Sequence, residues 1–188
     1  QRVVLVGLDH ALQPLAGFAG ILGRVIGDRQ QRIAANPALG EECDAPRAVE
    51  ALLQRIAGGI HRLLVACAGD QVVGLCAIGP SQDPDAGGAT GEVTVLGVHP
   101  DARRQGHGPR LLNAGADLLR EAGADTGSLW LLAHDETTRE FAAASGFAPD
   151  GAYRDRVVSP DGQTLREVRL SASLLDSEPG GPGDLEPA

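Results

Sequence analysis

A run of arginine and glycine residues in the middle of the chain has the composition of an anion-binding loop. It reads Arg103-Arg-Gln-Gly-His-Gly108, follows a predicted strand and leads directly into a predicted helix. Amide N–H groups at a helix N-terminus attract phosphate oxygens, and glycine lets the backbone approach a ligand closely. Arg103, Arg104 and Arg110 add positive charge to an acidic protein. The pattern predicts a site for a phosphate-bearing ligand.

The alternative interpretation of this segment is an ordinary turn between a strand and a helix. Glycine accounts for 26 of the 188 residues, so a single Gly-x-Gly arises by chance in such a chain. The preceding strand, the following amphipathic helix and the three arginines favour the phosphate site.

Glu92 is the carboxylate whose position best suits proton transfer. It begins the strand that enters the loop, where it could accept a proton from a substrate ammonium directly or through water. The alternative is a solvated charge at a strand end. His99 and His107 flank the arginines and could donate to a phosphate, although surface-loop histidines are the simpler interpretation of both.

These residues depend on secondary structure to bring them together. The elements expected before the loop are a strand at 3–6, mainly helix from 11 to 57 with a second helix beginning near Pro46, a hairpin of strands 62–68 and 71–78, an exposed loop at 80–90 and a strand at 92–99.

The elements expected after the loop are an amphipathic helix closed by Gly123, a strand at 128–133, a helix at 136–145, and strands at 152–158 and 163–171. Because a helix separates them, the strands at 92–99 and 128–133 should run parallel. Trp130 is expected to pack in the core and Asp135, which follows His134, to cap a helix. Residues 173–188 are predicted to be a disordered acidic tail.

Composition limits the classes of function. The formal net charge of -9 argues against general binding to nucleic acid. No apolar run approaches the roughly 20 residues that a membrane-spanning helix needs, so a cytoplasmic protein without a membrane partner is expected. The three cysteines show no metal-ligand spacing, and no metal is predicted.

The loop and its surroundings resemble the GCN5-related N-acetyltransferase (GNAT) family. Arg103 to Gly108 matches the family's R/Q-x-x-G-x-G/A signature, and it follows Leu96-Gly-Val-His-Pro100 as that signature follows the fourth strand. Leu129-Trp-Leu-Leu132 resembles the fifth strand, and Phe141-Ala-Ala-Ala-Ser-Gly-Phe147 resembles the Phe-Tyr-Glu-x-x-Gly-Phe segment after it. The resemblance covers about residues 1–172.

The resemblance implies an α/β (α+β) fold: a mixed, mostly antiparallel central sheet of six to seven strands, helices on both faces, and a parallel pair of strands that splay apart. Acetyl-CoA would lie between the splayed strands. The backbone at Leu96, Gly97 and Val98 would pair with its pantetheine arm. The residues implied to hold its pyrophosphate are Arg103, Arg104, Gln105, Gly106, His107 and Gly108.

The activity that the resemblance implies is transfer of an acetyl group from acetyl-CoA to a primary amine, with Glu92 as the candidate base. Where many members carry a tyrosine after the first Phe of the last segment, this chain has Ala142. Tyr153, the only tyrosine, is therefore the candidate acid, with Ser145 and water as alternatives. The acceptor would be a small-molecule amine or a protein amine, and a homodimer is possible.

Two other functions fit the same residues. Ala142, together with Pro109, which removes one N–H from the phosphate site, would suit a catalytically degenerate module that binds acyl-CoA or regulates. A domain that binds another phosphorylated ligand is the second, and the match at 141–147 argues against it.

Overall fold

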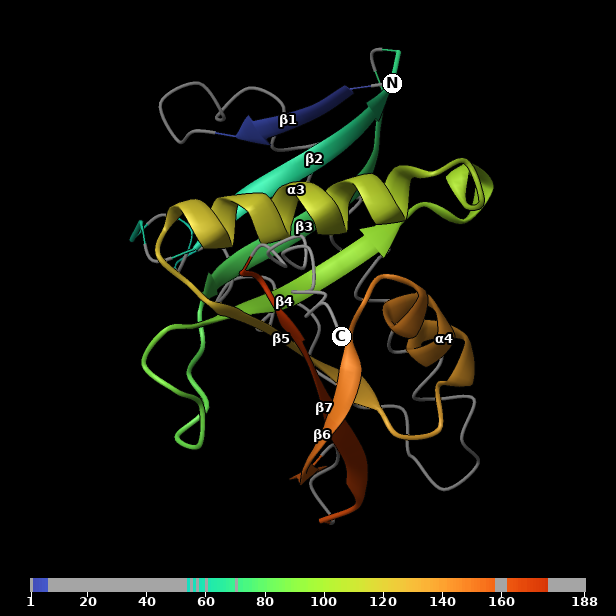
Figure 1. The fold of residues 1–188 in the computed structure, drawn as a ribbon. Helices are drawn as coiled ribbons and strands as arrows, with labels where there is room; N and C mark the ends of the chain where they lie inside the picture. The colour runs from blue at the N-terminus through green and yellow to red at the C-terminus, as the bar shows by residue number, and fades with distance from the viewer. Residues whose placement is uncertain are drawn as a thin grey trace, which may run out of the picture.

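The structure, a computed structural model, describes residues 2–6, 54, 56, 58–59, 61–69, 71–157 and 162–175 (Figure 1). In this part of the chain seven strands form one sheet in the order β1-β2-β3-β4-β5-β7-β6. The strands are β1 (Arg2–Val6), β2 (Arg62–Ala68), β3 (Gln71–Pro80), β4 (Thr90–Val98), β5 (Thr126–Leu132), β6 (Ala148–Val157) and β7 (Thr164–Ser173), and the helices are η2 (Pro100–Ala102), α3 (His107–Glu121) and α4 (Glu136–Ala144).

The β2–β3 hairpin forms where the sequence predicts it. Gly69, with a φ of 60°, supplies the left-handed residue that the turn needs. Both strands are apolar without alternation, and side chains on both of their faces are buried, including Leu63 and Leu64 on successive residues.

Among the strands that the structure describes, one neighbouring pair is parallel and the other pairs are antiparallel. The parallel pair is β4 and β5, as predicted from the helix between them. The antiparallel pairs are β1–β2, β2–β3, β3–β4, β5–β7 and β6–β7. The mixed, mostly antiparallel sheet that the sequence predicts is confirmed.

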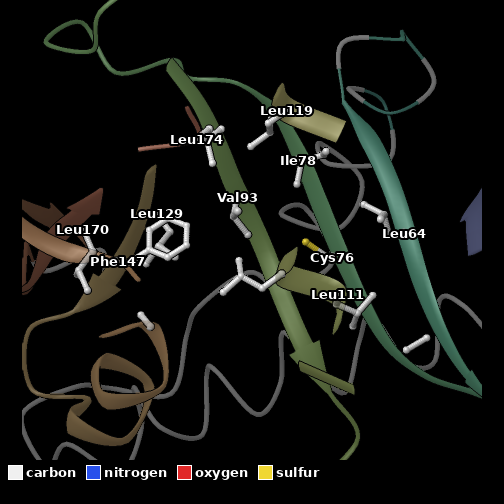
Figure 2. Close-up of a cluster of buried hydrophobic side chains, with 13 residues drawn as sticks. Leu64, Cys76, Ile78, Val93, Leu111, Leu119, Leu129, Phe147, Leu170 and Leu174 are labelled. Carbon is white, nitrogen blue, oxygen red and sulfur yellow. The ribbon is translucent and has the colours of Figure 1, made fainter. Parts of the chain in front are cut away.

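Helices α3 and α4 contribute to one buried cluster with the sheet and therefore pack on the same face of it. Figure 2 shows the side chains of this cluster. Leu111 and Leu112 of α3, Ala142 of α4 and Phe147 belong to one buried cluster with strand residues such as Val93 and Leu129. Gly91 lets α3 approach β4 closely, because a Cβ there would come within 2.5 Å of the Leu119 side chain.

Some predicted elements differ from the structure or fall outside it. The helices predicted between 11 and 57 lie outside the described residues, apart from Gln54 and Ile56, which are helical, so helices on the second face stay a prediction. Strand β6 begins at Ala148 rather than near 152, because Ala148 and Pro149 already pair with β7. The tail predicted from Ser173 starts too early: β7 includes Ser173, and the Leu174 side chain is buried.

Candidate functional site

Strands β4 and β5 are paired along only a short part of their length. The aligned residues are Thr90 with Thr126, Gly91 with Gly127, and Glu92 with Ser128. Beyond this point β4 continues to Val98 beside β3, whereas β5 continues to Leu132 beside β7. The two strands therefore diverge, and no described strand pairs with the β5 side of the β4 edge that carries Leu96, Gly97 and Val98.

A β-bulge lies just beyond the point of divergence. Val95 is opposite Ala77 and Val93 is opposite Ile78, so Thr94 is the extra residue of β4. The Thr94 hydroxyl donates to the Ala77 carbonyl at 3.1 Å. A bulge bends its strand, and this one bends β4 where it leaves β5.

The loop of residues 103–108, called here the arginine–glycine loop, joins the end of β4 to α3. Arg104 and Gly106 both have left-handed backbones, with φ of 60° and 81°. A left-handed arginine is strained by about 1–2 kcal/mol, and such strain is concentrated at functional sites. Gly106 is the N-cap of α3 and offers no side chain to its first N–H groups. The Arg103 Nε donates to the Val98 carbonyl at 3.3 Å.

The two histidines near the loop have different environments. His99 is partly buried, and its Nδ1 accepts from the Asp101 N–H at 3.4 Å. His107 is buried, so its interpretation as a surface histidine is wrong. Its side chain turns inward because it opens the first turn of α3 on the packed side, and within the described residues its Nε2 has no hydrogen-bond partner. His107 could thus reach a phosphate only through its backbone N–H.

Helix α4 packs beside Gly108, the last residue of the arginine–glycine loop. Gly108 lies at the junction of α3, α4 and β4, where an added Cβ would make ordinary van der Waals contact with the Phe141 ring at 3.4 Å and with Val98 at 3.9 Å. Asp135 caps α4 as predicted, with its Oδ1 accepting from the Thr138 N–H at 3.1 Å. Ala142 is buried in the core and brings no polar group to the site.

A cavity of about 660 Å³ opens between the 81–89 loop and strands β4, β5 and β6. This cavity, called here the sheet pocket, is lined by Gln82, Asp83, Pro84, Asp85, Glu92, Thr94, Trp130, Gly151, Ala152, Tyr153 and Arg154. Val93 and Leu129 point into the core beneath the helices. Neighbouring residues of a strand point to opposite faces, so Glu92, next to Val93, and Trp130, next to Leu129, lie on the face of the sheet opposite α3 and α4.

Glu92 is one of the residues that line the sheet pocket. Its Oε2 accepts from the Ser81 hydroxyl at 3.3 Å, and no ion pair to it occurs within the described residues. The hydroxyl of its β5 partner, Ser128, donates to the Gly91 carbonyl at 3.1 Å and so closes the last paired position of the two strands. The predicted base therefore lies where β4 and β5 separate.

Trp130 is a wall of the sheet pocket, and its assignment to the core is wrong. The Arg154 guanidinium lies 4.2 Å from the centroid of its ring. The Arg154 Nε donates to Glu167 at 2.7 Å, and Arg156 lies 3.5 Å from the same carboxylate. Glu167 is fully buried, and its position is maintained by this charge pairing.

Arg169 ties the 81–89 loop to β6. Its Nη1 lies 2.7 Å from Asp83 and its Nε lies 2.6 Å from Asp150. Burial lowers the pKa of the Arg169 guanidinium, but the hydrogen bonds and charges of Asp150 and Asp83 together raise it above its ordinary value. Arg169 thus stays charged and holds one wall of the sheet pocket in place.

Tyr153 borders the sheet pocket, but its side chain does not join Glu92. It pairs with Val168, whose side chain packs against the core beneath the helices, and directly opposed residues share a face. The side chain is 62% exposed, and the Arg166 guanidinium lies 4.5 Å from the ring centroid. The other candidate acid, Ser145, donates its hydroxyl to the Phe141 carbonyl at 3.0 Å.

The strand divergence lies between the arginine–glycine loop, at the end of β4, and the sheet pocket, which contains the Glu92 carboxylate. Sequence reasoning missed Thr94, Trp130 and Arg154 as pocket residues. The available signal for Arg154 was the spacing of Arg154 and Arg156, which an extended strand places on one face. Among the described residues no group of three or more His, Cys, Asp or Glu could hold a metal ion, and no helix is long and apolar enough to cross a membrane.

Comparison with known proteins agrees with this geometry. Residues 32–147 match the model of the Acetyltransferase (GNAT) family. A mycothiol acetyltransferase of Parafrankia sp. is 35% identical over 130 residues, which are 69% of this chain and 33% of that protein. The chain spans between 22% and 41% of the length of the three curated relatives that it matches.

Solved structures show the same fold. The ribosomal-protein-alanine N-acetyltransferase of Brucella melitensis superposes with a TM-score of 0.66 at 21% identity, covering 92% of this chain and 99% of the other. A Salmonella typhimurium protein described as an acetyltransferase, solved with its cofactor acetyl-CoA, gives 0.62 at 17% identity, covering 94% and 95%. The family match extends over more than half of this chain, and the chain therefore belongs to the GNAT acetyltransferase family.

Proposed function

We propose that this chain transfers the acetyl group of acetyl-CoA to a primary amine. The observation that carries the proposal is the divergence of β4 from β5 directly after Glu92 and Ser128. It lies between the arginine–glycine loop and the sheet pocket, so a cofactor held by the first and an acceptor held by the second would meet there.

The residues of the arginine–glycine loop fit the phosphates of coenzyme A. Gly106 leaves the first N–H groups of α3 uncapped by a side chain, and Arg103, Arg104 and Arg110 flank this position in the sequence. The β4 edge at Leu96, Gly97 and Val98 would orient the pantetheine arm through backbone hydrogen bonds. When bound, acetyl-CoA supplies the activated thioester.

Glu92 is proposed to prepare the acceptor. An ammonium group cannot attack a carbonyl, so the amine must first lose a proton. Glu92 lies at the point of divergence and accepts only the Ser81 hydroxyl within the described residues, which leaves carboxylate lone pairs for the ammonium proton. Holding the amine there also supplies the orientation that acyl transfer requires.

The proton that the departing thiolate needs is proposed to come from water. Tyr153 is the alternative donor in the sequence, and its cross-strand pairing with Val168 directs the side chain to the other face of the sheet. Ala142 fills the position of the family's usual tyrosine and has no proton to give.

The acceptor is proposed to be a small amine that fits the sheet pocket. The curated relatives are named mycothiol acetyltransferases, and they support acetyl transfer as the reaction class. Because this chain spans less than half of each, their acceptor is not carried over to it.

The test combines binding with turnover. The purified protein is first heated with acetyl-CoA, and with ATP as a control for general phosphate binding. Thiol release is then followed with a panel of primary amines. Stabilisation by acetyl-CoA beyond ATP together with amine-dependent thiol release is expected. Stabilisation without release for every amine would favour the degenerate binding module, and equal stabilisation by both ligands would favour a different phosphorylated ligand.

A further inference from the structure

Arg154 lines the sheet pocket and has N–H donors that form no hydrogen bond with any described residue. Its Nε donates to Glu167 at 2.7 Å. Within the part of the chain that the structure describes, its two Nη groups have no hydrogen-bond partner. The side chain is 46% exposed and lines the pocket, so these groups are available to a ligand.

The guanidinium of Arg154 is held in one orientation. Trp130 supports it from one side at 4.2 Å from the ring centroid, and Glu167, fully buried, fixes its Nε edge. A guanidinium whose plane and one edge are already fixed loses little freedom when its other edge binds two oxygens. This is the arrangement that recognises a carboxylate or phosphate through a pair of hydrogen bonds.

The charges around the sheet pocket separate into a positive and a negative side. Arg154 and Arg156 share the single carboxylate of Glu167, so one positive charge within this group of three residues is not compensated. Asp83 is paired with Arg169, at 2.7 Å. The pocket carboxylates that make no ion pair within the described residues are Glu92 and Asp85.

We infer that Arg154 binds an anionic group of the acceptor, so that the acceptor is a small molecule carrying both a primary amine and a carboxylate or phosphate. This inference rests on the proposed acetyl transfer. The amine would lie at Glu92, beside the point where β4 and β5 part. The anion would lie at the Nη edge of Arg154, on the β6 side of the same pocket.

The experiment compares amines that differ in one group. The probes are 4-aminobutyrate, 4-aminobutanol and 1,4-diaminobutane, which share a chain length, and ethanolamine beside O-phosphoethanolamine. Wild-type protein is expected to have a kcat/KM roughly tenfold or more higher for the anionic member of a set. The carboxylate and phosphate arms show which anion is preferred.

Arg154→Met should abolish that preference by raising KM for the anionic amines, and Arg154→Lys should restore part of it. Arg156→Met is the matched control, because Arg156 contacts the same Glu167 but does not line the pocket. It should leave the preference unchanged. The ratio of two kcat/KM values within one variant does not depend on how much of that variant is folded.

Two results would overturn the inference about Arg154 while leaving the proposed acetyl transfer intact. One is wild-type protein that uses the neutral or dicationic amines as well as the anionic ones. The other is a preference for the anionic amines that survives in Arg154→Met. Wild-type protein that releases no thiol with any amine would instead contradict the proposed function.

Discussion

Glu92 and Ser128 face each other at the last position where β4 and β5 are paired. From the next residue on, among the strands that the structure describes, β4 pairs only with β3 and β5 pairs only with β7. The carboxylate of Glu92 therefore lies beside the position where β4 and β5 separate, and it lines the sheet pocket. The chemistry that we propose depends on this placement.

Glu92→Gln is expected to lower kcat for acetyl transfer by roughly 10²-fold or more, because general base catalysis contributes on that order. Stabilisation by acetyl-CoA should be unchanged. Activity of the variant should recover in part as pH rises toward the pKa of the acceptor amine, since the free amine needs no base. Asp85→Asn is the control, as another pocket carboxylate without an ion pair in the described structure. Equal losses in both variants would count against Glu92 as the base.

Tyr153→Phe separates the two sources of the second proton. Because the phenol lies on the face opposite Glu92, we expect kcat to change by less than about tenfold. A fall of roughly 10²-fold, with the alkaline limb of the pH–kcat profile removed, would make Tyr153 the acid and would require its side chain to turn into the pocket. The measurement is steady-state thiol release across pH.

The extent to which the sequence predicts this structure differs between local and long-range features. The β2–β3 hairpin, the helix after the arginine–glycine loop and the cap at Asp135 depend on neighbouring residues, and all are confirmed. The parallel pairing of β4 and β5 follows from the helix between them. The first three features have causes within a few residues, and the parallel pairing has its cause in the single helix that connects the two strands.

The environments of Trp130 and Arg154 could not be predicted from the neighbouring residues in the sequence. Trp130 lies in Leu129-Trp-Leu-Leu132, an apolar run without alternation, so its pattern does not reveal which face meets the core. The environment of Arg154 is set by Glu167 and Trp130, which lie 13 and 24 residues away in the chain. Such pairings arise only when β5, β7 and β6 come together in the sheet.

Gly106→Ala is expected to weaken acetyl-CoA binding more than it weakens the fold. The residue has a φ of 81°, and an added Cβ would lie 3.4 Å from the Arg110 guanidinium. The strain costs about 1 kcal/mol of folding stability. Gly123→Ala is the control, because Gly123, just beyond the end of α3, has a φ of 90°, and a Cβ added there would meet no atom within 4 Å. Both variants should lose similar thermal stability, and only Gly106→Ala should lose the shift produced by acetyl-CoA. A full shift in Gly106→Ala would argue against the loop as the phosphate site.

Cys76 should make the folding free energy depend on alkaline pH. Burial raises the pKa of its thiol to about 12. In the unfolded chain the thiol ionises at about pH 8.5, so above that value only the unfolded state loses the proton. The stability from the neutral buried thiol is complete below about pH 8.5 and is lost, at up to about 1.4 kcal/mol per pH unit, as pH rises toward 12.

Denaturant unfolding at pH 8, 9 and 10 measures this dependence. Cys76→Ala should be less stable at pH 8, because it removes a buried side chain, but should lose stability less steeply with pH than the wild type. Cys67→Ala, at a partly buried position, should keep the wild-type slope. Identical slopes in all three proteins would show that Cys76 ionises as readily when folded as when unfolded.

Asp83→Asn should affect the acceptor without affecting the cofactor. It removes the charge that Arg169 holds at 2.7 Å and so frees the 81–89 loop, which forms one wall of the sheet pocket. We expect KM for the acceptor to rise severalfold, kcat to change little, and amide hydrogen exchange in the loop to accelerate. Asp155→Asn is the control. It breaks the ion pair between Asp155 of β6 and Arg166 of β7, at 2.9 Å, and neither residue lines the pocket. If Asp155→Asn raised the acceptor KM as much, the effect would belong to the strand pair as a whole, and the bridge from Arg169 to Asp83 would have no particular role in shaping the pocket.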